Sequence, residues 1–315
     1  MCVLSRFPWR SIVSNSLILG HKTLHLENAF RSSPLQVEHL PMLRVLILLS
    51  CLLLASVSLV LAESDRIPFS APEESSIPAG PQGDLIRRGR LILTDTPQQL
   101  PDYVHSRLRC SNCHLKAGTV AYAAPWVGVT TRYPRYSRRS AGEVSLPQRI
   151  QGCFRRSLNS DAPAVDSEPM QAIIAYMVWL SQGISDGYRL EGWGFPRLSE
   201  NPQPDRQRGE QLFLDRCAVC HGKDGQGRLD ETPQRYPYGF PPLWGKSSFN
   251  IAAGMARLHK AAAFIQRNMP FSSGGTLTIQ QAYDVADFVI HQPREDYPAK
   301  IHDWPEGGKP SDARY

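Results

Sequence analysis

Two short motifs of the same form constrain this chain more than any other feature. Each is a C-x-x-C pair followed at once by histidine, and they read Cys110-Ser111-Asn112-Cys113-His114 and Cys217-Ala218-Val219-Cys220-His221. C-x-x-C-H is the attachment motif of haem c, in which both thiols bond to the porphyrin and the histidine becomes an iron ligand. A single copy also fits a redox pair or half of a zinc site, whereas two copies favour haem. We therefore predict two covalently bound haem c groups.

Composition agrees with two small domains. The 315-residue chain is 42% apolar and 20% charged, as globular proteins are. Its 26 prolines and 23 glycines exceed the needs of a helical bundle and predict irregular segments wrapped around a porphyrin. A helix before each haem motif, loops around the ring and a closing helix are typical of small cytochromes c. The predicted fold is mainly α, with two cytochrome c-like domains that each wrap one haem.

The net charge of +6 suits anionic partners. No helix-turn-helix, RNP or zinc-finger pattern accompanies this charge, so we do not expect nucleic acid to be the partner.

An apolar run at 45–62 follows Met42-Leu43-Arg44. A basic start, an apolar centre and small residues before Glu63 are typical of a secretory signal. The length of the run also fits an uncleaved membrane anchor. We expect export to the periplasm, with membrane contact only if the segment is not cleaved, and Met42 as the natural start.

Helical periodicity and capping residues divide the remainder of the chain. They predict helices at 84–94, 168–181 and 278–291, and a further helix that begins after Ser145 and carries Cys153. The predicted organisation is an extension at 1–41 that is non-native or unstructured, a signal peptide or anchor at 42–62, a flexible leader at 63–83, an N-terminal cytochrome c domain at 84–182, a linker at 183–204, a C-terminal cytochrome c domain at 205–294 and a C-terminal tail at 295–315.

Two methionines are candidates for the sixth ligand of the second iron. Met269 lies in a loop before the closing helix, the usual place for such a ligand, and methionine raises the reduction potential of a haem. Met255 lies in an apolar stretch where a role in the core is the simpler interpretation. We favour Met269 on position, and the choice stays open.

The first iron lacks an obvious sixth ligand. No histidine follows His114 before Gly183, and Met170 and Met177 both lie within an apolar helix. Cys153 is the best remaining candidate, because a thiolate binds iron and is also a nucleophile. The alternative is a buried and inert thiol.

The neighbours of Cys153 favour a functional role. Arg149, Cys153 and Ser157 are spaced i, i+4 and i+8, so they share one face if the segment is helical. Arginine binds oxyanions in bidentate fashion and lowers the pKa of a nearby thiol. Arg149 is well placed to hold an anion, whereas Arg155 and Arg156 fit a solvated basic face. Arginines also crowd this region at Arg132, Arg135, Arg138 and Arg139.

Four stretches together resemble one family, the dihaem thiosulfate dehydrogenases, which are tetrathionate-forming c-type cytochromes. The resemblance covers about 84–294 and implies His/Cys ligation of the first haem and His/Met ligation of the second. It also implies substrate-binding roles for Arg139, Arg149 and Ser157. Ser160 departs from the glycine expected after Asn159. The stretches are Cys110 to Leu115 with Ala117-Gly118, Ala124-Pro125-Trp126-Val127-Gly128-Val129, Arg149 to Ser157, and Phe240-Pro241-Pro242-Leu243-Trp244-Gly245.

The function that this resemblance implies is oxidation of two thiosulfate ions to tetrathionate at Cys153. Electrons then leave through the second haem to a cytochrome c or a similar acceptor, and the chemistry is reversible. Two alternatives stay open: a cytochrome that loads thiosulfate onto a carrier protein's cysteine, and a dihaem electron-transfer protein with no substrate. A dihaem peroxidase is disfavoured, because no spacing suggests its distal acid and calcium ligands.

Overall fold

The structure, a computed structural model, describes residues 49–50, 66–228 and 239–315. The extension predicted at 1–41 lies outside the described residues, and so does the signal or anchor predicted at 42–62, except for Leu49 and Ser50. All helices and strands named below belong to one compact unit, Ser58–Tyr315. Within the described ranges, no helix has both the length and the apolar character to cross a membrane.

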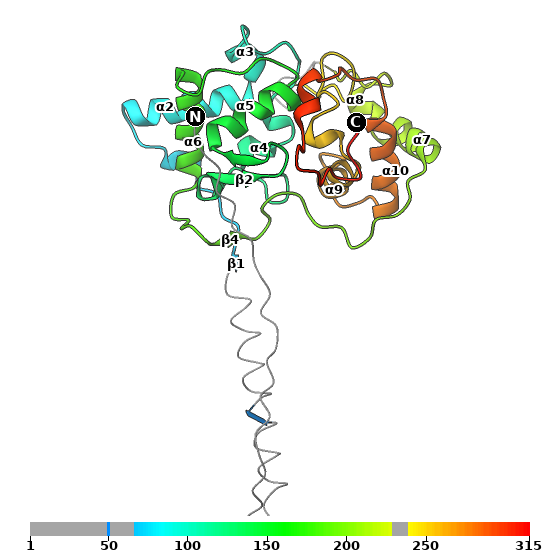
Figure 1. The fold of residues 1–315 in the computed structure, drawn as a ribbon, viewed down its shortest axis with the longest axis horizontal. Helices are drawn as coiled ribbons and strands as arrows, with labels where there is room; N and C mark the ends of the chain where they lie inside the picture. The colour runs from blue at the N-terminus through cyan, green and yellow to red at the C-terminus, as the bar shows by residue number, and fades with distance from the viewer. Residues whose placement is uncertain (1–48, 51–65, 229–238) are drawn as a thin grey trace, which may run out of the picture. The chain divides into compact units, whose positions relative to one another are not determined.

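Two helices cross in the first half of this unit (Figure 1). α2 (Pro81–Thr94) packs against α6 (Glu168–Leu180), which confirms the helices predicted at 84–94 and 168–181. A Cβ added to Gly89 would lie 1.9 Å from the carbonyl oxygen of Ala172. Only glycine therefore lets the two backbones approach this closely.

The second half repeats the crossing with its own helices (Figure 1). α7 (Arg206–Arg216) and α9 (Leu258–Asn268) both pack against α10 (Ile279–Ile290), whose N-cap is Thr278. A Cβ added to Gly209 on α7 would lie 2.0 Å from the carbonyl oxygen of Asp284 on α10. The predicted closing helix is confirmed, and a glycine again permits the contact between the first and last helix of a domain.

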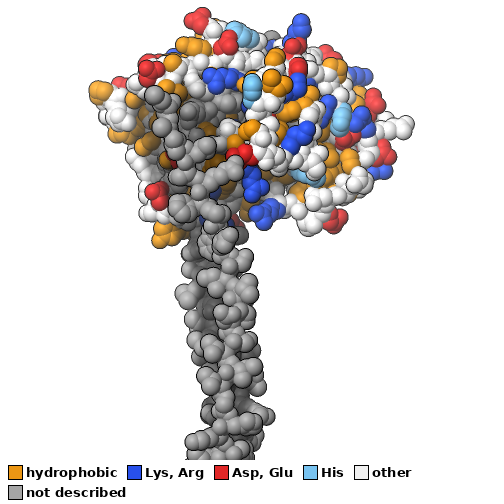
Figure 2. All heavy atoms as spheres, viewed as in Figure 1, with side chains coloured by type: hydrophobic (Ala, Val, Ile, Leu, Met, Phe, Trp, Pro, Cys, Tyr) orange, Lys and Arg blue, Asp and Glu red, His pale blue; other side chains and the backbone are white. Residues whose placement is uncertain are grey.

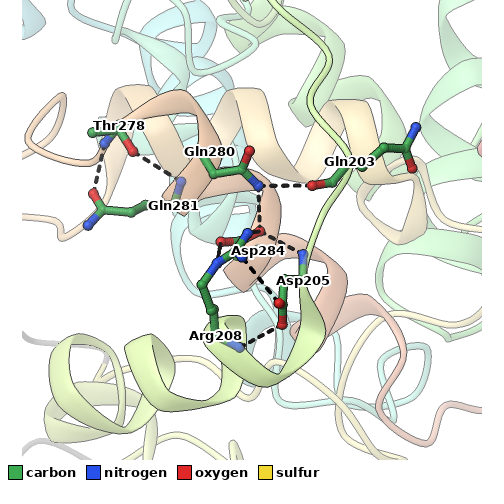
Figure 3. Close-up of polar contacts among 7 residues, drawn as sticks. All are labelled: Gln203, Asp205, Arg208, Thr278, Gln280, Gln281 and Asp284. Atoms are coloured by element: carbon green, nitrogen blue, oxygen red, sulfur yellow. Dashed lines mark hydrogen bonds and ion pairs between the residues drawn. The ribbon is translucent and has the colours of Figure 1, made fainter.

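A buried carboxylate fastens the start of α7 to α10. Asp284 accepts hydrogen bonds from Arg208 Nε at 2.9 Å, from the backbone N–H of Asp205 at 2.7 Å and from Gln280 Nε2 at 2.7 Å (Figure 3). Burial raises the pKa of Asp284, but these hydrogen bonds and the charge of Arg208 outweigh burial and leave the pKa below its ordinary value. The carboxylate is therefore ionised at neutral pH and holds the two helices together.

α5 (Leu146–Ser157) begins at the predicted N-cap. Ser145 Oγ accepts from the Gln148 backbone N–H at 3.4 Å, and Gln148 Oε1 accepts from the Ser145 N–H at 2.9 Å. This capping box satisfies backbone donors that the first turn leaves unpaired. After the helix, the hydroxyl of Ser160 accepts from the His105 N–H at 3.0 Å. Ser160, which stands where the family resemblance suggested glycine, thus ties the end of α5 to the loop before the first haem motif.

The remaining elements are short. β1 (Arg66–Ile67) pairs in parallel with β4 (Arg189–Leu190), and β2 (Arg135–Ser137) pairs antiparallel with β3 (Gly142–Val144). The short helices are η1 (Glu74–Ser76), α3 (Thr96–Gln99), η2 (Cys110–Asn112), α4 (Leu115–Gly118), η3 (Val129–Arg132), α8 (Ala218–His221), η4 (Gly254–Ala256) and η5 (Pro298–His302).

The main hydrophobic core joins residues of both halves. Phe249, Ala253 and Ala256 come from the second half, and they are buried in one cluster with Ile92 of α2 and Phe154 of α5. The two predicted domains therefore pack against each other through a shared hydrophobic core.

Two segments expected to be irregular connections pack against the first half. In the stretch predicted as a leader, Ile77 is buried and Glu74 pairs at 2.8 Å with an arginine of α2. In the stretch predicted as a linker, Leu190 is buried, and the carbonyl oxygen of Gly192 accepts from a backbone N–H of the loop after the first motif. The described part of the leader and the linker are ordered because both meet partners far away in the sequence.

The C-terminal tail packs in the same way. Asp303 accepts two hydrogen bonds at 2.9 Å from the guanidinium of Arg156, and its carboxylate is almost fully buried. Trp304 lies under Arg139, 4.8 Å from the guanidinium carbon to the ring centroid. The tail therefore covers the end of α5 and the β2–β3 turn.

Candidate haem and thiol site

The first haem motif brings its histidine against a backbone carbonyl. Nδ1 of His114 lies 2.5 Å from the carbonyl oxygen of Ala124, and the ring stacks on Trp126 with centroids 4.8 Å apart. A carbonyl only accepts hydrogen bonds, so Nδ1 carries the proton and Nε2 keeps the lone pair that a metal needs. Burial lowers the pKa of His114 to about 4, so the imidazole is neutral at neutral pH.

The second motif has the same histidine geometry. His221 ends α8, and its Nδ1 lies 3.0 Å from the carbonyl oxygen of Pro241. Burial again lowers the pKa of the imidazole. Both histidines are thus held in the tautomer that leaves Nε2 free to bind a metal.

A cavity of about 950 Å³ reaches both motifs. Its wall includes Cys113, Cys217, Cys220 and His221 together with aromatic and aliphatic side chains. Trp179 also lines the cavity, and its buried Nε1 has no hydrogen-bond partner among the described residues. Apolar walls with an unpaired donor fit a flat apolar ligand that carries polar groups at its edge, as haem does.

Two observations disfavour a simple metal site at the thiols of the first motif, because a metal binds the thiolate and needs several ligands. Burial raises the pKa of Cys110 and of Cys113 to about 12, and the charge of Cys153 adds to both shifts. Among the described residues, no group of three or more His, Cys, Asp or Glu side chains is arranged to hold a metal ion. The residues present fit haem c.

Cys153 lies on α5 with Arg149 one turn before it and Ser157 one turn after it. The helix confirms that these three side chains share one face. The interaction with Cys153 is the main cause that raises the pKa of Arg149, so the guanidinium stays protonated beside the thiol. The charge of Cys153 also raises the pKa of Cys110 and Cys113. Cys153 therefore lies within electrostatic reach of both Arg149 and the first haem motif.

Arg139 reaches the same region from the turn between β2 and β3. Its Nη1 donates to the carbonyl oxygen of Ala252 at 2.8 Å, and its Nε lies 3.8 Å from the carboxylate of Asp303. The guanidinium is therefore fixed by residues of the second half and of the tail. No local sequence pattern marks these partners, because they lie more than a hundred positions away from Arg139.

The other arginines of this region do not gather with Cys153. Arg135, Arg138 and Arg155 are exposed, and a solvated position was the expectation for Arg155. Arg132 lies over Trp193 at 3.5 Å, and Arg156 is not solvated as expected, because Asp303 pairs with it. On the face drawn in Figure 2, basic side chains are interspersed with acidic ones. On that face, the basic side chains do not form one continuous patch.

Both candidate methionines line the cavity. Met269 follows the last residue of α9, and its N–H donates to the Ile265 carbonyl oxygen at 2.9 Å. Met255 lies in η4 and packs against the core of the first half. Both methionines are partly buried and pack against one further cluster, so packing does not separate them, and Met269 stays the predicted ligand on its position before the closing helix.

Comparison with known proteins identifies both halves. Residues 104–185 match the cytochrome c domain of SoxA/TsdA, and residues 204–289 match a domain described as cytochrome C oxidase, cbb3-type, subunit III. Two cytochrome c domains imply that the chain binds haem c.

Full-length relatives and a solved structure agree. The thiosulfate dehydrogenase of Psychrobacter arcticus is 42% identical over 80% of this chain and 76% of its own length. That of Allochromatium vinosum is 45% identical over 74% of this chain and 86% of its own. The solved thiosulfate dehydrogenase (TsdBA) of Marichromatium purpuratum is 35% identical with a TM-score of 0.67, and the match covers 73% of this chain and 50% of that one. This chain is therefore a cytochrome c oxidoreductase that belongs to the thiosulfate dehydrogenase family.

Proposed function

We propose that this chain joins two thiosulfate ions into tetrathionate in its first domain and releases two electrons through its second. The observation that carries the proposal is the position of Cys153, one turn from Arg149 and within electrostatic reach of the first haem motif. Relatives that are 41–45% identical are thiosulfate dehydrogenases, which supports thiosulfate as the substrate.

Two haem c groups fit the two motifs. Cys110 and Cys113 would attach the first, with His114 and Cys153 as ligands of its iron. When bound, the haems supply one-electron acceptors. The second would be held by Cys217, Cys220, His221 and Met269.

The residues around Cys153 have distinct tasks in this reaction. The sulfane sulfur of a first thiosulfate bonds to the Cys153 sulfur, and two electrons leave this pair of sulfurs. The sulfane sulfur of a second thiosulfate then attacks the first one, the bond to Cys153 breaks and tetrathionate leaves. Arg139 and Arg149 bind the sulfonate groups, and Ser157 donates a hydrogen bond to one of them.

Electron exit and location complete the proposal. Electrons leave from the second domain to a cytochrome c or a similar acceptor. The signal-like segment at 42–62 supports export to the periplasm, with membrane contact only if that segment is not cleaved. Because each bond-forming step can run backwards, the same residues also serve tetrathionate reduction.

Steady-state turnover of the haem-loaded protein tests this function. With an artificial electron acceptor, thiosulfate should be consumed and tetrathionate formed in a ratio of two to one. Arg149→Gln should lower kcat/KM about 100-fold, because a charge-assisted contact to the anion is lost. Arg155→Gln is the matched control, since Arg155 is an exposed arginine of the same helix, and it should keep wild-type kinetics.

The rival functions give different results in this assay. An electron-transfer protein without a substrate would consume no thiosulfate. A cytochrome that loads thiosulfate onto a carrier protein would not form tetrathionate under any condition. It would consume thiosulfate only when a carrier protein with a free cysteine is added. Either result would overturn the proposal.

A further inference from the structure

Lys260 is a cation without an acidic partner among the described residues. It lies in the first turn of α9, in the second cytochrome domain. Its neighbours share the nearby carboxylate: Arg257 Nε donates to Asp312 Oδ1 at 2.8 Å, and the His259 N–H donates to Asp312 Oδ2 at 3.2 Å. Both oxygens of Asp312 are therefore engaged, and no described hydrogen bond or ion pair involves the ammonium of Lys260.

This ammonium approaches the same turn as Arg139. A Cβ added to Gly254 would lie 3.8 Å from Lys260 Nζ, and Arg139 donates to the carbonyl oxygen of Ala252 two residues earlier. The helix η4, which starts at Gly254, packs against α5, the helix that carries Arg149 and Cys153. Three elements from both domains thus bring Lys260, Arg139 and Arg149 toward one place.

The charge environment of Lys260 is dominated by other cations. Its side chain is accessible to solvent, yet burial is the main cause that lowers its pKa to about 8. The charges of Arg257, Arg149 and Arg139 lower this pKa further, while Asp312 raises it. The side chain of Arg149 is also accessible to solvent. An anion from solvent can therefore reach both Lys260 and Arg149.

Like charges repel, and the ammonium of Lys260, unlike the guanidinium of Arg139, has no carboxylate partner among the described residues. Holding Lys260 near two guanidinium groups costs free energy in the empty protein, and a dianion between them would relieve this repulsion. Thiosulfate and tetrathionate are dianions with sulfonate groups at their ends.

We propose that Lys260 is a further substrate-binding residue, and that it binds a sulfonate group of thiosulfate or tetrathionate together with Arg139 and Arg149. The inference rests on the proposed function for the identity of the anion. It makes the substrate site a composite of both cytochrome domains, because Arg149 and Cys153 come from the first and Lys260 from the second.

Equilibrium binding of tetrathionate to the oxidised holoprotein tests Lys260 without turnover, because the oxidised protein has no electrons with which to reduce the ligand. Lys260→Met should raise the Kd for tetrathionate, measured by calorimetry, about tenfold or more. Lys260→Arg should keep most of the wild-type affinity, because it keeps the positive charge. Lys223→Met is the matched control, since Lys223 is an exposed lysine of the same domain, and its affinity should equal that of the wild type. The KM for thiosulfate should rise in Lys260→Met more than kcat falls.

Thermal unfolding separates binding from structure. Removing Lys260 relieves repulsion, so Lys260→Met should be at least as stable as the wild type. If Lys260→Met bound tetrathionate as tightly as the wild type, or if the wild type did not bind it at all, the inference would be wrong. If the wild type bound tetrathionate through Lys260 but did not oxidise thiosulfate, the anion site would stand and the proposed function would fail.

Discussion

Cys153 and Arg149 lie one turn apart on α5, and this spacing joins a nucleophile to a cation. A thiolate is the reactive form of cysteine, and a protonated guanidinium nearby favours it. The sequence predicts this pair because both residues belong to one helix with a local N-cap and a regular apolar period. Lys260 escapes such a prediction, since only η4, which packs against both α5 and α9, brings these two helices together.

Met269 and Met255 provide a test of iron ligation. Met269→Ala should lower the reduction potential of one haem by on the order of 100 mV, because axial ligands set potentials over about 0.8 V and methionine raises them. Met255→Ala is the matched control, since Met255 lines the same cavity, and it should leave both potentials unchanged. Potentiometric titration of the holoproteins measures both, and a drop in Met255→Ala alone would make Met255 the ligand.

The crossing of α2 and α6 depends on one glycine. Gly89→Ala should lower the free energy of unfolding by about 1–3 kcal/mol, because the new methyl group would meet the carbonyl oxygen of Ala172 at 1.9 Å. Gly152→Ala is the control within another helix, where a Cβ meets nothing within 4 Å. It should be neutral or stabilising by about 0.5–1 kcal/mol. Equal destabilisation of the two variants in urea titrations would contradict this account of the crossing.

Helices with local signals were predictable as elements. α2, α5, α6 and α10 each combine an apolar period with a proline or a capping residue near the start, and all four are confirmed. The contacts that these helices make were not predictable. Glycine is a poor helix former, and only the carbonyl oxygens opposite Gly89 and Gly209 show why glycine is needed there.

The tail, the linker and the described part of the leader all pack against the domains, although their composition suggests loose connections. Their partners are distant: β1 pairs with β4, and Asp303 meets Arg156 across 147 positions of sequence. No local sequence pattern predicts such pairs, because neither residue of a pair stands in a motif that points to its distant partner. The sequence therefore predicted two domains but not the residues through which these domains pack against each other.

Asp303 tests whether the tail stabilises the whole unit. Asp303→Ala should lower the free energy of unfolding by about 1.5–3 kcal/mol, because the guanidinium of Arg156 loses its bidentate partner in a largely buried place. Asp296→Ala is the control, since Asp296 pairs with Lys300 on an exposed surface and should change stability little. Denaturant titration measures the free energy of unfolding of both variants. An equal loss in the two would show that the contact of Asp303 with Arg156 stabilises the protein no more than an exposed ion pair does.

The most direct test of the central claim is anaerobic mixing of the oxidised holoprotein with thiosulfate, followed by the haem absorbance and by an assay for tetrathionate. The wild type should show haem reduction together with tetrathionate. Cys153→Ala should keep its haem content and slow this reduction roughly 1,000-fold or more, because the sulfur that bonds to the substrate is gone. If Cys153→Ala reduced its haems and formed tetrathionate at the wild-type rate, Cys153 would not be the reacting thiol.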